Sequence, residues 1–228
     1  MKSLRYLAAA ALAAGFIASP ANATLFVFKS GGVQPHDVPL GNIVKNCGTI
    51  NTDYCTADPD LGFTYSKAGI TVNAVALSDG EPTTLIQDIF PDNSGLGAFS
   101  DGETDAQDQV ETNSDEALEF VFNTAVWLSN IEFNSGADRD CSAASQPEGV
   151  CGSFNLYIDD VFYASIAAVD LLTDTFYGTK FLFEAATEDA GFVIAQFEVS
   201  DVPVPAALPL LLSGLAGLGF ASRRRKTA

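Results

Sequence analysis

Apolar and polar residues alternate with a period of two through most of the chain, and this pattern constrains the fold more than any other feature. In ALEFVFN, Leu118, Phe120 and Phe122 fall on one face, whereas Glu119 and Asn123 fall on the other. Similar runs lie at 69–78, 126–134, 153–158, 179–185 and 193–200. Because successive side chains of a strand point to opposite faces of a sheet, the pattern predicts strands that are buried on one face.

The arrangement of these strands predicts an all-β fold. No segment between 24 and 201 has a strong helical period, and LYIDDVFYASI predicts a hairpin that turns at Asp159–Asp160. Short strands separated by turns rich in Gly, Asn and Asp favour an antiparallel β-sandwich, jelly-roll-like in its strand order. Residues 31–62 and 91–116 are rich in turn-forming and acidic residues, and we predict that both are loops.

The N-terminus has the features of a secretory signal peptide. Lys2 and Arg5 precede an apolar run over 6–17, and Pro20 is followed by the small-x-small site Ala21-Asn22-Ala23. The alternative, an uncleaved N-terminal helix, is disfavoured by the proline and by that site. We therefore expect residues 1–23 to be removed and the acidic domain at 24–201 to be exported.

The C-terminus predicts a membrane span with a fixed orientation. Residues 202–222 carry no charge, and as a helix they would extend about 30 Å, which is the thickness of a bilayer core. The basic residues that follow would stay in the cytoplasm, so the domain before the span would lie outside. A buried core helix would not end in such a cluster. The basic residues are Arg223, Arg224, Arg225 and Lys226.

The end of the chain resembles a known bacterial signal. Val202-Pro203-Val204-Pro205-Ala206, the Gly- and Leu-rich span and the basic cluster resemble the C-terminal sorting signal of PEP-CTERM exported proteins. The motif is closest to the VPLPA-type variant, with Val204 in place of Leu, whereas members with the usual motif have Glu there. More weakly, GLGAFSDGETD and DEALEFVFNTAVWLSNIEF resemble a sandwich region common in such proteins.

The resemblance implies a destination and a partner. The sorting domain, residues 202–228, would be recognised by an exosortase, a membrane protease or transpeptidase, and the helix would anchor the precursor in the inner membrane with its domain in the periplasm. The product would be a surface or matrix protein of a Gram-negative bacterium, in an exopolysaccharide, biofilm or floc context. The departure at Val204 leaves open which processing enzyme acts on it.

The exported domain is strongly acidic. All 29 Asp and Glu residues, but only five of the eleven Lys and Arg residues, lie between Thr24 and Asp201, so its formal charge is −24 against −18 for the whole chain. Such a surface repels nucleic acid and anionic headgroups, and we expect no nucleic-acid partner. It suits multivalent cations, although solubility alone also explains it.

The acidic segment 91–116 is the candidate metal site. It has eight carboxylates in 26 residues, and Ca²⁺ binds six to eight oxygen ligands. The spacing is not that of an EF-hand, because Ala106 and Thr112 occupy the positions that need Gly and Glu. The alternative is a solvated loop. The candidate ligands are Asp101, Glu103, Asp105, Asp108, Glu111 and Glu116, with Glu119 on the adjoining strand.

The four cysteines and the single histidine indicate whether the domain has disulfides or a catalytic site. An even number of cysteines in an exported protein predicts disulfides, and we favour the local pairs Cys47–Cys55 and Cys141–Cys151 over a metal site. His36, in a predicted loop, is the one imidazole that could serve a nucleophile. We therefore expect no catalytic site.

Two hypotheses follow for the exported domain. The first is a structural or adhesive protein that contacts polysaccharide or Ca²⁺; the second is a secreted glycan hydrolase or lyase that uses carboxylates. Trp127, Tyr157 and Tyr163 are available for stacking on sugars, although the apolar neighbours of Trp127 in AVWLSNIEF favour a place for it in the core.

Overall fold

The computed structural model describes residues 23–29, 37–45, 54–88, 95–99, 110–111, 115–135, 139–141, 151–187 and 191–201. The chain divides into a compact unit over Asn22–Asp201 and a second unit made of Met1–Ala21 and Val202–Ala228. The second unit lies outside the described residues, so the signal peptide, the sorting motif, the membrane helix and the domain bounds stay predictions. Within the described ranges, no helix is long and apolar enough to cross a membrane.

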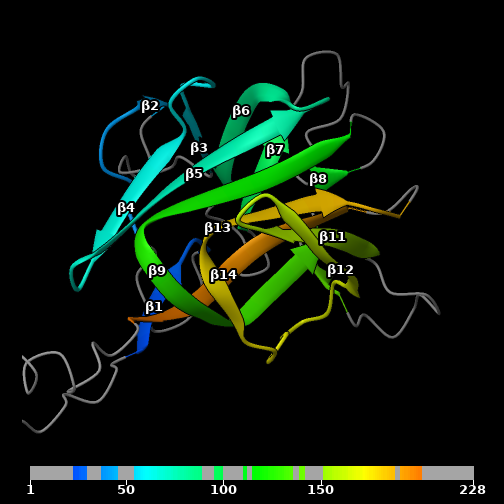
Figure 1. Cartoon of the computed structure of the whole chain (residues 1–228). Helices are drawn as coiled ribbons and strands as arrows, with labels where there is room; N and C mark the ends of the chain where they lie inside the picture. The colour runs from blue at the N-terminus through cyan, green and yellow to red at the C-terminus, as the bar shows by residue number, and fades with distance from the viewer. Residues whose placement is uncertain are drawn as a thin grey trace, which may run out of the picture. The chain divides into compact units, whose positions relative to one another are not determined.

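Every element of the described part is a β-strand, and every pairing between strands is antiparallel (Figure 1). The predicted all-β antiparallel fold is therefore confirmed. The strands are β1 (Ala23–Val27), β2 (Ile43–Lys45), β3 (Tyr54–Ala57), β4 (Phe63–Lys67), β5 (Ile70–Ser78), β6 (Glu81–Asp88), β7 (Leu96–Phe99), β8 (Val110–Glu111), β9 (Glu116–Ser135), β10 (Arg139–Asp140), β11 (Ser153–Ile158), β12 (Val161–Ala167), β13 (Phe176–Ala185) and β14 (Gly191–Asp201).

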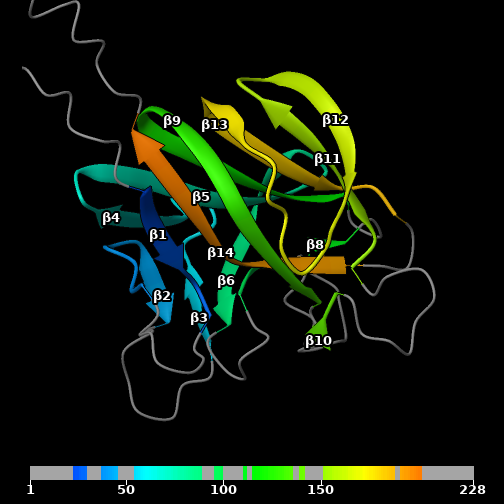
Figure 2. The ribbon, with the colours of Figure 1, turned by 90° about the horizontal axis from the view of Figure 1, so that it is seen from below.

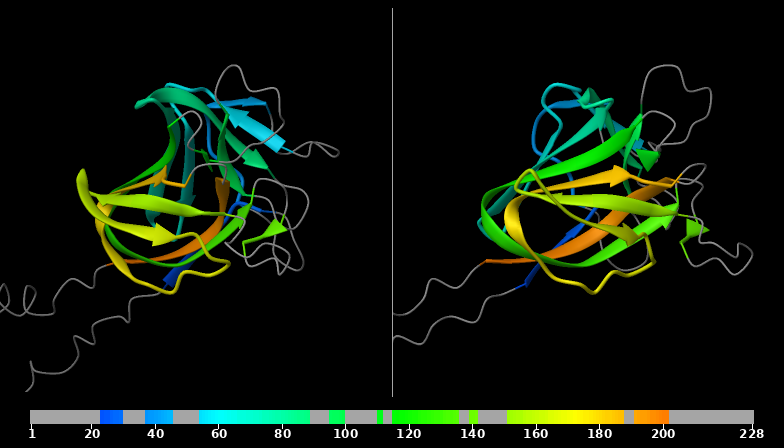
Figure 3. Two further views of the ribbon diagram at one scale, coloured as in Figure 1. Left: turned by 90° about the vertical axis from the view of Figure 1, so that its right-hand side faces the viewer. Right: turned by 45° about the vertical axis from the view of Figure 1, so that its right-hand side comes forward.

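Five strands close into a barrel in the order β5-β6-β7-β14-β9, and β9 then pairs with β5. The closure depends on β9, whose 20 residues pair with β5 near its start and with β14 near its end. We predicted two separate strands here. Asn130 has φ +49°, and the buried positions change from Val126 and Leu128 to Ile131 and Phe133 across it. This irregularity lets one strand curve around the core (Figure 3). The jelly-roll-like sandwich is not confirmed.

A second group of strands extends from the other edge of β9, in the order β9-β13-β11-β12 (Figure 2). β11 and β12 form the predicted hairpin, with φ +50° at Asp159 and +68° at Asp160. Gly178 of β13 allows the hairpin to approach closely, because a Cβ there would lie 2.5 Å from Cγ2 of Ile158. We call the four strands β9, β13, β11 and β12 the outer sheet.

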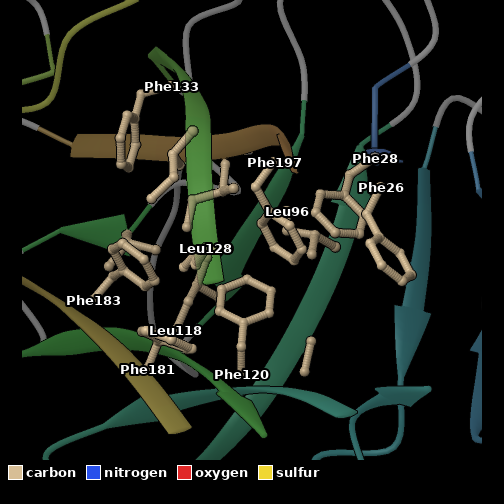
Figure 4. Packing of buried hydrophobic residues seen from close by; sticks show 14 of the residues in the cluster. Phe26, Phe28, Leu96, Leu118, Phe120, Leu128, Phe133, Phe181, Phe183 and Phe197 are labelled. Atoms are coloured by element: carbon tan, nitrogen blue, oxygen red, sulfur yellow. The ribbon is translucent and has the colours of Figure 1, made fainter. Parts of the chain in front are cut away.

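The core is built largely from phenylalanine rings (Figure 4). Phe120, on β9, lies with its ring centroid 5.2 Å from that of Phe197 and 5.9 Å from that of Phe183. Further along β9, Phe133 stacks on Phe154 at 5.1 Å. The alternation in the sequence predicted the inward positions of Phe120 and Phe197 correctly.

The two predicted loops contain strands. β2 and β3 form within residues 31–62, and β7 and β8 form within residues 91–116, so both loop predictions were partly wrong. These strands are two to four residues long, and three of them pair with partners further along the chain: β3 with β6, and β7 and β8 with β14. Their position depends on tertiary pairing, which a local turn signal does not reveal.

One of the two predicted disulfides is confirmed. Cys141 and Cys151 are bonded, with their Cα atoms 5.1 Å apart, and both are buried. Cys55 is also buried and disulfide-bonded. Cys47 lies outside the described residues, so the Cys47–Cys55 pairing stays a prediction.

Candidate functional site

Most of the candidate calcium ligands lie outside the described part of the structure. Asp101, Glu103, Asp105 and Asp108 lie outside it. Glu111 is in β8 with its side chain not described, and Glu116 begins β9 with its side chain buried. Among the described residues, no group of three or more His, Cys, Asp or Glu is placed to hold a metal ion. The calcium site stays a prediction, as does the place of His36, which is not described.

The outward face of the outer sheet carries an exposed aromatic pair on β9 and β13. Trp127 and Tyr177 are register partners in adjacent strands, and their ring centroids lie 4.9 Å apart. Trp127 is 41% exposed and Tyr177 is 48% exposed. The prediction that Trp127 belongs to the core was wrong, because Val126 and Leu128 occupy the inward positions and direct the residue between them outward.

A second aromatic pair lies on the same face, on β11 and β12. Tyr157 pairs in register with Phe162, and their ring centroids are 5.5 Å apart. Leu182 of β13 pairs with Tyr157 on its other side, so apolar and aromatic side chains continue across three strands. We call the two ring pairs, Trp127–Tyr177 and Tyr157–Phe162, the aromatic face.

Tyr163 does not belong to the aromatic face. Its ring contacts Phe176 at a centroid distance of 5.6 Å. Because Phe176 and Tyr177 are consecutive in β13, they point to opposite sides, and Tyr163 lies on the side away from Tyr177. Tyr177 and Phe162 were missed from the sequence, although the alternation of Phe176, Tyr177 and Gly178 contained the signal for the first.

Polar side chains next to the second pair form a connected set of hydrogen bonds. The Tyr157 hydroxyl and the Asn155 amide both donate to Oε2 of Glu184, each at 3.1 Å. The Ser165 hydroxyl donates to Oδ1 of Asn155 at 2.5 Å. Desolvation raises the pKa of Tyr157, and the Glu184 charge and hydrogen bond add to the shift. These groups are held in place before any ligand arrives.

A charged group lies between the two ring pairs. Nζ of Lys180 is 2.8 Å from Oε2 of Glu119 and 2.9 Å from Oδ1 of Asp160. The hydrogen bonds to Asp160 and Glu119 are the largest causes of the raised pKa of Lys180. Asp159 supports this end of the sheet, because its Oδ1 accepts from the backbone N of Thr179 and of Lys180.

The chemistry of this face suits a ligand that has both apolar and hydroxyl-bearing surfaces. Exposed aromatic rings attract C–H groups over their faces, and carboxylate, amide and hydroxyl groups beside them exchange hydrogen bonds with hydroxyls. Sugar rings combine both properties. Comparison of the chain with protein-family models, with curated proteins and with solved structures found no match.

Proposed function

We propose that this chain is an exported surface or matrix protein that holds polysaccharide on its aromatic face. The observation that carries the proposal is the gathering of Trp127, Tyr177, Tyr157 and Phe162 on one outward face, beside hydrogen-bonding groups that are already oriented. A contiguous patch of exposed aromatic rings commonly marks an interaction site, which favours a binding role over a purely structural one.

The charge of the domain narrows the class of polysaccharide. The formal charge of −24 over residues 24–201 disfavours an anionic chain such as one rich in uronic acid. Next to the rings, Lys180 is shared between two carboxylates, and Glu184 adds another. We therefore propose a neutral glycan, bound along the face across both ring pairs.

Export and sorting complete the proposal. The signal peptide at 1–23 and the sorting domain at 202–228 would deliver the domain to the outside through an exosortase-type enzyme. The Cys141–Cys151 disulfide supports an oxidising destination. A C-terminal tag tests the processing step: its retention on surface-exposed protein, in cells with an active exosortase, would contradict cleavage of the tail.

Affinity electrophoresis through gels that contain neutral or anionic polysaccharides tests binding. We expect neutral polysaccharide to retard the protein, and Trp127→Ala and Tyr157→Ala each to weaken binding at least about tenfold, because truncating a central aromatic costs about 2 kcal/mol. Tyr163→Ala is the matched control in dilute protein, because this tyrosine is also exposed but lies off the face. Equal weakening by all three variants would contradict the assignment.

Glycan cleavage and calcium binding are separate proposals for the exported domain, and each has its own test. If incubation with the glycan releases shorter chains, and one carboxylate substitution abolishes the release, then the carboxylate-based hydrolase or lyase replaces the binding role. Calcium binding by the acidic segment 91–116 predicts a higher melting temperature in millimolar Ca²⁺. An unchanged melting temperature would contradict calcium binding by this segment.

A further inference from the structure

β12 ends the outer sheet with one edge unpaired. The backbone N of Ala168 donates to the carbonyl of Gly152 at 2.9 Å, which fixes the order of the hydrogen bonds between β11 and β12. Because these bonds alternate along a strand, Ile166 faces β11, whereas the N–H and C=O groups of Ser165 and Ala167 face away from it. β12 has β11 as its one strand partner among the described strands.

At the opposite end of the sheet, the outward backbone groups of β1 have hydrogen-bond partners from other segments. At the outward edge of β1, the backbone N of Val27 donates to Oδ2 of Asp37, and the carbonyl of Val27 accepts from the backbone N of Asp37. Nζ of Lys67 donates to the carbonyl of Leu25 at 2.8 Å. In the described part of the chain, no comparable segment or lysine reaches the outward edge of β12.

The composition of β12 also leaves its edge open. VFYASIA contains no charged residue and no proline, the residues that usually block an edge strand. Val161, Phe162 and Tyr163 are all exposed. A register shift beside Leu156 and Tyr157 distorts the first part of the strand, so the regular edge is the part that begins at Ala164.

We propose that this edge pairs with β12 of a second copy of the chain, antiparallel across a two-fold axis. The strand is self-complementary in that orientation. Its first half is bulky, with Val161, Phe162 and Tyr163. In its second half Ala164, Ser165 and Ala167 are small, and Ile166 falls opposite Ala164 of the antiparallel copy. An antiparallel copy sets each bulky half against a small half, whereas a parallel copy sets bulk against bulk. A two-fold axis near Ser165 places Tyr163 of one copy next to Ala167 of the other.

The charge of the domain gives this association a distinctive salt dependence. Two copies that each carry a formal charge of −24 repel each other, while the paired strands themselves are uncharged. Salt screens the repulsion and leaves the backbone hydrogen bonds, so the dimer strengthens as salt is added. A cationic strand from a different protein would bind more weakly in salt. The short regular edge also predicts a weak, reversible dimer.

Pairing would place two aromatic faces on the same side of one continuous sheet, because Phe162 of the aromatic face lies on β12 itself. One glycan chain could then contact both copies, and apparent affinity would rise without any new contact. The dimer itself does not depend on glycan binding, and either proposal can fail while the other holds.

Sedimentation of the exported protein, purified from cells that express the full chain, tests the proposal directly. We expect a dimer that grows with protein concentration and with salt. Ala167→Pro removes an outward N–H without touching the bonds to β11, and we expect it to abolish the dimer. Ala167→Ser is the matched control, because it keeps that N–H. A protein that stays monomeric in high salt, or a dimer that Ala167→Pro leaves intact, would overturn the proposal.

Amide exchange on the wild-type chain keeps the test valid if the proline variant does not fold. Raising the concentration from monomer to dimer should slow exchange at Ser165 and Ala167 by at least about tenfold, whereas Ile166 is protected throughout. Unchanged exchange at both residues would contradict pairing at this edge. Protection that appears with another protein, but never with a second copy, would assign the edge to a foreign strand instead.

Discussion

Replacing Phe120 by alanine tests which positions of β9 point into the core. Phe120 is fully buried and lies opposite Ala74 of β5 and Phe181 of β13. Its ring centroid is within 6.4 Å of those of Phe28, Phe183 and Phe197. Removing a buried phenylalanine costs about 3–5 kcal/mol, and the loss of three ring contacts places this site near the upper end of that range.

The neighbouring residue provides the control. Val121 points to the outward face and is 39% exposed, so Val121→Ala should cost less than about 1 kcal/mol. Urea unfolding of both variants measures the difference directly. For a domain of this size, the Phe120→Ala loss corresponds to a melting temperature lower by about 6–20 °C. If the two variants lose similar stability, the assignment of inward and outward positions along β9 is wrong.

Three further predictions concern the stability of the domain. Replacing Cys141 and Cys151 together by serine should lower the free energy of unfolding by about 2–3 kcal/mol, because a loop of ten residues is released. A loss of stability no larger than that caused by an exposed Ser→Ala change would contradict this prediction. Burial raises the pKa of Tyr65 well above its usual value of 10.0, and the Asp37 charge adds to the shift. As the pH rises above about 10, the unfolded chain loses the Tyr65 proton before the folded chain does, so the free energy of unfolding falls. Urea unfolding at increasing pH should show a shallower fall for Tyr65→Phe than for the wild type. An equal fall in both proteins would exclude the Tyr65 phenol as the cause. Gly62→Ala should lower the free energy of unfolding by more than about 2 kcal/mol, because its Cβ would lie 2.0 Å from a carbonyl oxygen of β5. Gly69→Ala should lower it by about 1 kcal/mol, because the space around Gly69 is open. Melting curves that rank the two variants in the opposite order would refute the close approach of Gly62 to β5.

The sequence predicted the parts of the fold that depend on local alternation. The inward positions of β9 up to Phe122 and the hairpin at Asp159–Asp160 follow from residues close together in the chain. The closed barrel does not, because it requires β14 to pair with β7 through Ile194 and Leu96, and one strand to serve both ends. Such distant pairings leave no periodic signal in the segments that make them.

The candidate site was predicted less completely than the fold. Tyr157 was identified as available, but Trp127 was assigned to the core because its immediate neighbours are apolar. In a strand, the neighbours of an outward residue are the inward ones, so apolar flanks are compatible with exposure. Tyr177 completes the pair from a strand 50 residues further along the chain, and only the register between β9 and β13 brings the two rings together.

Fluorescence of Trp127 reports directly on whether the aromatic face holds a neutral glycan. It is the only tryptophan in the chain, and it is partly exposed beside Tyr177, so a sugar stacked on this pair must change its emission. Titration of the exported protein with a neutral polysaccharide, at a protein concentration low enough to keep it monomeric, should give a saturable change that Tyr177→Ala weakens at least about tenfold and Tyr163→Ala leaves intact. Emission that stays constant across neutral polysaccharides, or changes equally for both variants, would contradict the claim.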